Sequence, residues 1–318
     1  MRSATVAGLA GLLFAATASL GCAPGRDRVE AVQLPAPPAG QRPDGLYATW
    51  LGTAGVVIDD GETRLVIDPF VTRDRLGHVL FRRPVESDPA LVDHWLSRAG
   101  GFDVDAVFVT HSHYDHTLDA PMVALRTGAV LVGSPDTLLQ GRAHRLESRQ
   151  LVPAETGVPM HFGRFTVTLR PSEHGTPDLY PGHADKDFRV PARARDYRTG
   201  EVYVIVIEHP YGTLMHQGSA AWTDETYDES TRADVVLLGV AARDDTTEYI
   251  EGVVDRVGAK TIIPIHFDNF FRRLDRPWRP LFGVKLPEFF RVVDERPDLE
   301  VQTLPIGEPR QVVAAPTG

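Results

Sequence analysis

The stretch Val107-Phe108-Val109-Thr110-His111-Ser112-His113-Tyr114-Asp115-His116 places three histidines and an aspartate directly behind an apolar run. His111 and His113 are two residues apart, so at the end of an extended segment both imidazoles lie on one side. Asp115 and His116 follow where the chain turns toward a helix, and they can address a second ion. Capping or local hydrogen bonding would account for one such histidine but not for four ligand residues within six positions. Imidazole and carboxylate at this spacing suit zinc, with manganese or iron as alternatives.

The residues around this stretch form short β-type runs separated by turns and helical segments. Strands are expected at residues 47–51, 55–58, 64–68, 105–109, 129–132, 165–169, 202–208, 213–215, 233–238, 261–265 and, as the last strand, 300–304. Helices are expected at residues 118–126, 248–257 and 286–293, with a short one opening at Pro135. Strands in two groups interleaved with helices indicate an α+β fold with two sheets packed face to face and helices outside.

The overall composition is that of an ordinary globular protein. The chain has 318 residues, 42% of them hydrophobic, and a formal net charge of -10. This length allows one large domain or two smaller ones. The acidic balance argues against nucleic acid as the main partner, because nucleic acids are bound through basic surfaces.

The first 22 residues have the pattern of an export signal. Arg2 is followed by an apolar run over residues 5–16 and then by small residues, which is typical of a secretory signal peptide. The signal ends in Ser19-Leu20-Gly21-Cys22, and Cys22 is the only cysteine in the chain. This ending resembles a bacterial lipoprotein signal, in which the cysteine is lipidated and becomes the mature N-terminus, although Ser19 stands where leucine is usual. An ordinary cleaved signal and an uncleaved anchor are the alternatives.

The folded part of the chain is expected to begin near residue 46. Residues 23–45 are rich in Pro, Gly and Ala and lack an apolar period, so they are predicted to form a flexible tether. Residues 46–318 then form the folded domain. Within it, residues 175–200 show no clear period and are expected to form a long loop, and loops of this length inside compact domains are often functional.

Four motifs carry a resemblance to a known family. They are Ile67-Asp68-Pro69, Thr110-His111-Ser112-His113-Tyr114-Asp115-His116, Ser172-Glu173-His174-Gly175 and Pro264-Ile265-His266-Phe267-Asp268. The segment 110–116 resembles the H-x-H-x-D-H motif of the metallo-β-lactamase superfamily, and the resemblance covers nearly all of the folded chain. It implies a four-layer αββα sandwich of two β-sheets with outer helices. Residues 49–52, 66–70 and 304–308 are similar to the branch that contains L-ascorbate-6-phosphate lactonase-like and N-acyl-phosphatidylethanolamine phospholipase D-like proteins.

The resemblance also implies a role for each site residue. One metal would be held by His111, His113 and His174, and the other by Asp115, His116 and His266. Three imidazoles and a water form a competent catalytic zinc site, and the metal would generate hydroxide at neutral pH. Asp115 would orient that hydroxide or take its proton. Asp68 would hold a ligating histidine in its proper tautomer.

The resemblance is incomplete at the residue that bridges the two metals. The family places an aspartate after a strand that ends in glycine, whereas this chain has Gly218-Ser219, with Ser219 at the aspartate position. A neutral serine is a poor bridge, so with Asp115 as the only anionic ligand two dications would be under-neutralised. We therefore expect one tightly bound metal and a second that binds weakly. His216, Asp224 and Asp268 could compensate, but a surface or turn role is the more ordinary use of each.

The sequence thus supports a metal-dependent hydrolase that uses metal-bound hydroxide on an ester, lactone, amide or phosphodiester. The expected substrate is a small molecule or a lipid-like molecule. The lipid-like substrate is expected because a lipid on Cys22 would anchor the chain to a membrane of the bacterial cell envelope. The alternative is a catalytically inactive metal-binding surface lipoprotein, for which Ser219 is the evidence. Nucleic-acid processing is disfavoured by the acidic charge and the export signal.

Overall fold

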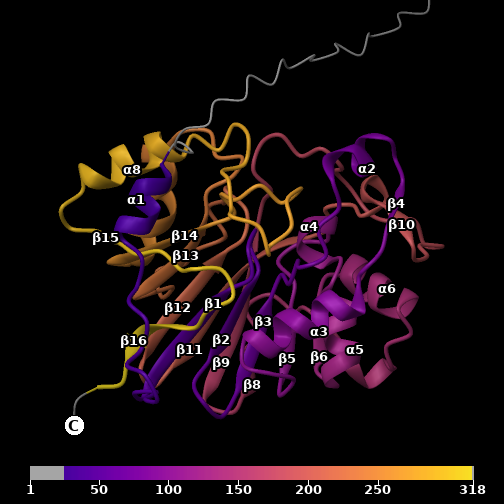
Figure 1. Cartoon of the computed structure of the whole chain (residues 1–318), viewed down its shortest axis with the longest axis horizontal. Coiled ribbons are helices and arrows are strands. Elements are labelled where there is room, and N and C mark those ends of the chain that lie inside the picture. Colours follow the sequence, from indigo (N-terminus) through magenta and orange to yellow (C-terminus); the bar gives the residue numbers. More distant parts are fainter. Residues whose placement is uncertain (1–24, 317–318) are drawn as a thin grey trace, which may run out of the picture.

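The computed structural model describes residues 25–316 as two β-sheets packed face to face (Figure 1). The first sheet has the strand order β16 (Arg310–Ala314), β1 (Gly45–Trp50), β2 (Val56–Asp59), β3 (Arg64–Ile67), β5 (Ala106–Phe108), β6 (Val130–Gly133), β7 (Leu151–Pro153). The second sheet has the order β15 (Glu300–Val301), β14 (Thr261–Ile265), β13 (Val235–Gly239), β12 (Gly212–Gln217), β11 (Val202–His209), β9 (Phe165–Ser172), β8 (Met160–Phe162). Each sheet is antiparallel on one side and parallel on the other.

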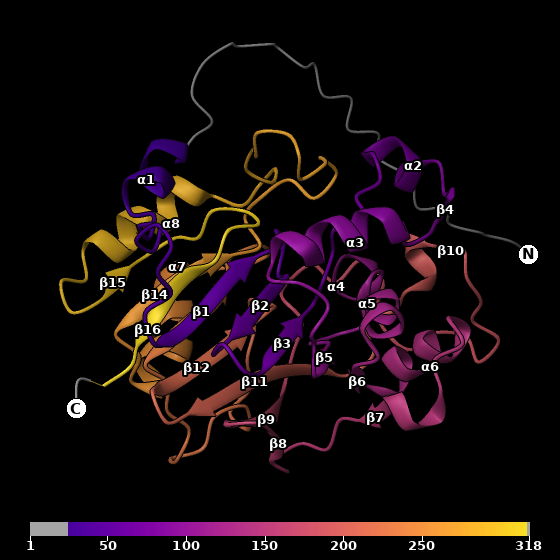
Figure 2. The ribbon, with the colours of Figure 1, turned by 60° about the horizontal axis from the view of Figure 1, so that its bottom comes forward.

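Helices cover the outer faces of both sheets (Figure 2). They are α1 (Arg26–Ala31), α2 (Leu76–Leu80), α3 (Pro89–Arg98), α4 (Tyr114–Thr117), α5 (Ala120–Thr127), α6 (Pro135–Ala143), α7 (Thr246–Tyr249) with its π-helical continuation Ile250–Asp255, and α8 (Leu286–Asp294). A small separate sheet pairs β4 (Pro84–Val85) with β10 (Ala192–Arg193). The predicted α+β sandwich with outer helices is confirmed. Within residues 25–316, none of these helices has the length and apolarity that a bilayer crossing requires.

The burial of side chains on both faces of the strands explains this architecture. In β2, Val56 and Ile58 belong to the apolar cluster between the two sheets, whereas Val57 packs in the cluster that contains residues of α3 and α5. Successive side chains of a strand point to opposite faces, so a strand that is apolar at every position is buried on both sides. The first sheet therefore packs against the second sheet with one face and against helices with the other.

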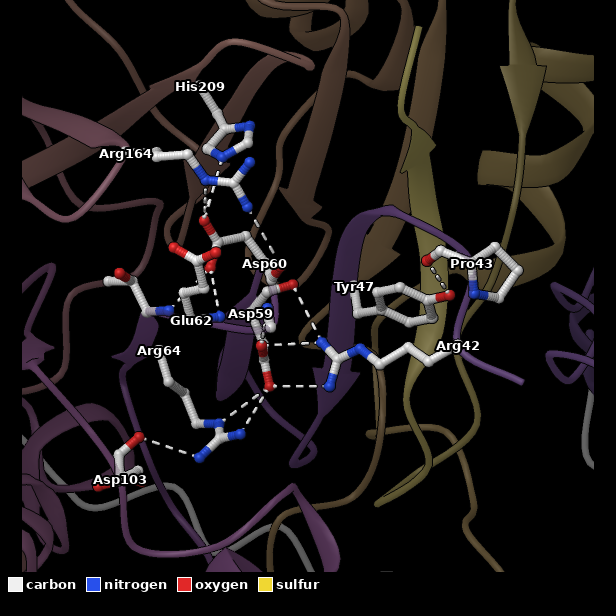
Figure 3. A network of polar contacts seen from close by, with 12 residues as sticks. Arg42, Pro43, Tyr47, Asp59, Asp60, Glu62, Arg64, Asp103, Arg164 and His209 are labelled. Carbon is white, nitrogen blue, oxygen red and sulfur yellow. Dashed lines mark hydrogen bonds and ion pairs between the residues drawn. The ribbon is translucent and has the colours of Figure 1, made fainter. Parts of the chain in front are cut away.

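A polar network joins the sheets at the turn between β2 and β3 (Figure 3). Asp60 in this turn accepts a hydrogen bond from Arg164 at 3.0 Å and pairs with His209 of β11 at 3.2 Å. The side chains of Asp60 and His209 are both fully buried. The preceding residue, Asp59, is bound by Arg64 at 2.7 Å and by Arg42 at 2.8 Å. The contacts of Asp60 with Arg164 and His209 link the first sheet to the second, whereas the ion pairs of Asp59 lie within the first sheet and the segment before it.

The N-terminal segment differs from the predicted tether. Residues 26–31 form α1, whose Val29 is 2% exposed, and Thr303 donates a hydrogen bond to the Val29 carbonyl at 2.6 Å. Arg28 pairs with Asp294 of α8 at 2.6 Å. The prediction of a flexible tether over residues 23–45 is therefore wrong for this segment, because a single buried valine and two long-range contacts fix it without any apolar period. The predicted signal peptide and Cys22 lie outside the described residues.

The C-terminal strands also differ from the prediction. The strand expected at residues 300–304 is only two residues long, and the last strand is β16, which pairs antiparallel with β1. The sequence of β16 has only two adjacent valines in its centre. It forms a strand because β1 offers an unpaired edge, and partners distant in sequence are not visible in a local pattern.

Candidate metal centre

The predicted ligand residues lie at the carboxyl ends of strands that share one edge of the sandwich. His111 and His113 follow β5, His174 follows β9, and His266 follows β14. The remaining two, Asp115 and His116, lie in the first turn of α4, for which His113 is the residue before the first helical position. Strand ends supported by a rigid sheet hold such side chains in fixed positions. Residues far apart in the sequence are thereby brought together.

The first group consists of His111, His113 and His174. The ring centroids of His111 and His174 are 4.9 Å apart and those of His113 and His174 are 4.7 Å apart. His174 Nδ1 donates to the Gly175 carbonyl at 2.6 Å, which leaves its Nε2 for a metal. His111 Nε2 is buried and has no hydrogen-bond partner within residues 25–316. One ring nitrogen from each histidine lies within 4.8 Å of the other two.

The second group consists of Asp115, His116 and His266. Asp115 Oδ2 is 3.8 Å from His116 Nε2 and 3.5 Å from His266 Nε2, and the two Nε2 atoms are 3.2 Å apart. In a tetrahedral zinc site with bonds of about 2.1 Å, ligand atoms lie about 3.4 Å apart. The spacing of this group matches that value. The ring centroid of His116 is 3.8 Å from that of His111, so the two groups are adjacent.

These two groups fit divalent metal ions. A buried ring nitrogen such as His111 Nε2 would carry an uncompensated desolvation cost without a partner. A metal ion supplies that partner. A third group, Asp136, His183 and Glu201, also has ligand atoms within 4.8 Å of one another. There, however, His183 Nδ1 is already hydrogen-bonded to Asp136 at 2.8 Å, and Glu201 is exposed.

Asp68 lies behind His116. Its fully buried carboxylate is 2.8 Å from His116 Nδ1 and accepts hydrogen bonds from the backbone N–H of Thr110 at 2.7 Å and from the Thr110 hydroxyl at 2.5 Å. Because the carboxylate can only accept, Nδ1 of His116 must carry the proton. The lone pair is then on Nε2, which faces His266 and Asp115. Asp68 thus fixes the tautomer that can bind a metal.

Two residues that support His113 were not predicted from the sequence. Asp178 Oδ1 is 3.2 Å from His113 Nε2, and the Thr199 hydroxyl is 3.0 Å from the same nitrogen while donating to Asp178 at 2.5 Å. Both residues come from the irregular segment 175–200. They hold the proton on Nε2 of His113 and leave Nδ1 for the metal. Their spacing in sequence gives no signal, although a long loop beside a strand-end histidine is where such partners would be sought.

The electrostatics of the first group and of Asp115 favour the metal-binding protonation states. Burial, followed by the proximity of the other rings, lowers the pKa of His111, and the same two causes bring the pKa of His174 to about 4. Burial acts to raise the pKa of Asp115, but the neighbouring rings of His116 and His266 outweigh it and hold that pKa well below its ordinary value. The imidazoles of the first group are therefore neutral and Asp115 is ionised at neutral pH, as metal binding requires.

Ser219 lines the same cavity as the ligands but has a second role. Its hydroxyl accepts a hydrogen bond from the backbone N–H of Gly175, beside His174, at 2.9 Å. The three candidates for compensating the missing aspartate do not join either group. The Asp268 carboxylate is bound by the Arg73 guanidinium, Asp224 is exposed, and His216 Nε2 donates to a backbone carbonyl. Among the described residues, Asp115 is the only carboxylate in the two groups.

The two groups form the floor of a cavity of about 660 Å³. Most of its wall is apolar and is made by Val79, Tyr114, Leu179, Tyr180, Ala241, Phe270, Phe271, Leu281, Phe282 and Val284. Phe270 and Phe271 both line the cavity, and the segment that carries them forms no helix. Trp278, in contrast, packs against Phe267 with ring centroids 5.2 Å apart.

Comparison with known proteins agrees with this geometry. The metallo-beta-lactamase superfamily profile matches residues 48–227. A metal-dependent hydrolase of the UPF0173 group from Heliobacterium modesticaldum is 32% identical over 284 residues, which cover 83% of this chain and 96% of that protein. A UPF0173 metal-dependent hydrolase from Methanoregula boonei is 27% identical over 231 residues, covering 71% and 83% of the two chains.

A solved structure shows the same fold. The metallo-beta-lactamase fold protein YhfI from Bacillus subtilis superposes with a TM-score of 0.54 at 16% identity, and the superposition covers 84% of this chain and 98% of that one. The profile match includes the H-x-H-x-D-H segment and His174. Together with the two ligand groups, these similarities assign the fold and the type of chemistry. The chain belongs to the metallo-beta-lactamase superfamily and is a metal-dependent hydrolase of that fold.

Proposed function

We propose that this hydrolase uses zinc to cleave an ester, lactone, amide or phosphodiester in a substrate that carries a large apolar group. The observation that carries the proposal is the position of the two ligand groups at the floor of a largely apolar cavity of about 660 Å³. Cavities that bind small molecules are typically of this size and are lined by apolar side chains with a few polar groups. Manganese or iron(II) would suit the same ligands.

The chemistry follows from the residues around the floor. When bound, the metal ions lower the pKa of a coordinated water and polarise the oxygen of the scissile group. Asp115 is the carboxylate that can orient this water and accept its proton, because it is ionised and lies 3.5 Å from His266 Nε2. The apolar wall excludes bulk water and strengthens these interactions.

We also propose that the two metals differ in affinity. The ion among His111, His113 and His174 meets three neutral imidazoles and needs no bridging carboxylate. The second ion meets Asp115, and Ser219 supplies no bridging charge. Two dications about 4 Å apart repel each other by several kcal/mol even at an effective dielectric near 20. The second ion should therefore bind weakly.

We place the protein in the bacterial cell envelope, held to a membrane by a lipid on Cys22. The support is the signal-like run that precedes this cysteine. Residues 49–52 and 66–70 favour the branch with lactonase-like and phospholipase D-like proteins. A lipid-like substrate agrees with both points. The second candidate is a metal-binding lipoprotein without activity, which the serine at position 219 favours.

A substrate panel tests the proposed function. Metal-loaded protein would be assayed on lactones, carboxylic esters, amides and phosphodiesters, each with a short and a long acyl chain. Asp115→Asn should abolish turnover with the fold intact, whereas Asp119→Asn, which changes a buried carboxylate outside the ligand groups, should retain it. Turnover by Asp115→Asn within a few-fold of the parent would exclude the assigned role. Absence of turnover with every class would favour the inactive lipoprotein.

A further inference from the structure

The mouth of the metal-site cavity is bordered by exposed apolar side chains. Within residues 25–316 eight large hydrophobic residues are exposed, and five of these lie in three segments that contribute to the cavity wall: Leu76, Leu80, Phe81, Leu179 and Phe282. Leu80 is 67%, Phe81 79% and Leu179 71% exposed. Soluble proteins expose single hydrophobic residues widely, but a concentration around one opening marks an interaction site. We call these five residues the mouth patch.

Cations flank the mouth patch in an otherwise acidic protein. Two segments contribute them: residues 75–83, which include α2, and the loop of residues 270–285 opposite it. Together they contain eight arginines and lysines and one acidic residue, Asp275, whereas the whole chain has a net charge of -10. Arg75, Arg82 and Arg83 are exposed. None of these three is in an ion pair with another residue of the described range. Their charges are therefore available to a partner.

This combination favours one class of partner. Apolar side chains surrounded by arginines are the pattern of segments that lie in the interface of a bilayer, where the apolar tips enter the acyl boundary and the cations meet anionic headgroups. An acidic protein partner would satisfy the arginines but would leave Leu80 and Phe81 to find a matching apolar groove. We propose that the mouth patch and its flanking arginines dock the cavity onto a phospholipid bilayer that carries anionic headgroups.

The position of α1 supports the same orientation independently. Figures 1 and 2 both place α1 on the same side of the molecule as α2 and the loop of residues 270–285. Cys22 precedes Arg26 by four residues, and four extended residues span about 14 Å. A lipid on Cys22 would therefore draw this side, and not the opposite one with β8, toward the membrane.

The inference extends the proposed function to the source of its substrate. A cavity whose mouth lies on the bilayer takes an amphiphile directly from the lipid phase, which avoids transfer of its acyl chain through water. For this consequence the inference rests on the proposed function, but the docking itself does not. An inactive protein would dock in the same way, so loss of docking and loss of turnover are separate results.

A fluorescent label tests the orientation on the membrane. Cys22 is the only cysteine, so Cys22→Ser in the full chain gives a cysteine-free background. In this background, Phe81→Cys provides one exposed site for a polarity-sensitive fluorophore. In a separate control variant, Val158→Cys provides an exposed site at the β8 end. Vesicles of phosphatidylcholine with about 30% phosphatidylglycerol, an anionic surface of the kind that attracts basic segments, should shift the emission at position 81 to the blue and leave position 158 unchanged. Equal shifts at both positions, or none at position 81, would overturn the proposal.

Charge reversal tests the role of the arginines. Arg82→Glu/Arg83→Glu in the protein labelled at position 81 should weaken vesicle affinity about tenfold or more, since basic residues near an anionic surface are attracted to it and acidic ones are repelled. Arg149→Glu, at an exposed position outside the mouth segments, should have little effect. Pure phosphatidylcholine vesicles should bind more weakly than anionic ones. Equal binding to both, or a blue shift that depends on protein concentration without vesicles, would show that the patch serves another purpose, such as self-association.

Discussion

Asp68→Asn should separate the two metal sites by weakening only one of them. The amide that replaces the Asp68 carboxylate presents an oxygen to the Thr110 N–H but an NH₂ to His116 Nδ1, which now lies 2.8 Å from Oδ2. An NH₂ donates, so Nδ1 must accept and the ring proton moves to Nε2. That nitrogen then has no lone pair for the second metal.

The size of the effect follows from the contacts that are changed. Loss of a hydrogen-bond partner behind a ligating histidine costs about 10–100-fold in metal affinity, which is about 1.4–2.8 kcal/mol. The first group should be affected far less, because His111, His113 and His174 have no hydrogen bond to Asp68. The variant should also unfold more easily by about 1–3 kcal/mol, since the Asp68 carboxylate is fully buried and satisfies a buried hydroxyl.

Chelator competition with elemental analysis measures this effect. The parent and variant would be dialysed against graded chelator and the retained metal counted at each concentration. Asp119→Asn is the matched control, because Asp119 is fully buried and also accepts three hydrogen bonds, two from the backbone N–H groups of Val71 and Thr72 and one from Ser87. It should lower stability without changing metal affinity. A second-metal affinity in Asp68→Asn equal to that of the control would refute the assigned tautomer.

Ser219→Asp should let the protein retain two metal equivalents through exhaustive dialysis, where the unmodified protein should retain one. Elemental analysis decides, and two equivalents in the unmodified protein would show that another group neutralises the second ion. Gly252→Ala should destabilise the fold by about 1–3 kcal/mol, because a Cβ there would clash with the Trp222 ring. Thermal unfolding checks this, and Trp222→Leu in the same chain should recover part of the loss. His209→Gln should reduce the loss of folding stability as the pH falls from about 7 to about 5, the range in which histidine ordinarily titrates. Burial lowers the pKa of His209 below 6.5, so the unfolded chain takes up the extra proton and acid favours unfolding. Urea titrations at both pH values measure the slope, which should stay unchanged if His209 is not involved.

The parts of the site that were predictable are those written as local patterns. An apolar strand followed by a residue of the site appears in the sequence at Asp68, His111, His174 and His266, and the fold brings these strand ends to one edge. The strands themselves were predictable because burial on two faces leaves a dense apolar run. The family resemblance implied the division of the ligands into two groups. The distances between the ligand atoms in the structure agree with that division.

The parts that were not predictable depend on contacts between distant segments. β16 is a strand only because β1 lies beside it, and α1 is fixed by Thr303 and Asp294. Asp178 and Thr199 reach His113 from a segment that is mostly irregular. An isolated aspartate or threonine in such a segment has many ordinary uses, so only the folded structure identifies its partner.

The distribution of the ligands between the sheets sets the order in which this protein can mature. Each group takes two ligands from the end of the first sheet and one from the second, namely His174 or His266. A chain that has folded only its first half, or that crosses a membrane unfolded, therefore contains no complete set and cannot retain a metal there. Metal loading comes last, and once loaded each ion ties the two halves together, so that bound metal stabilises the packed sheets against separation.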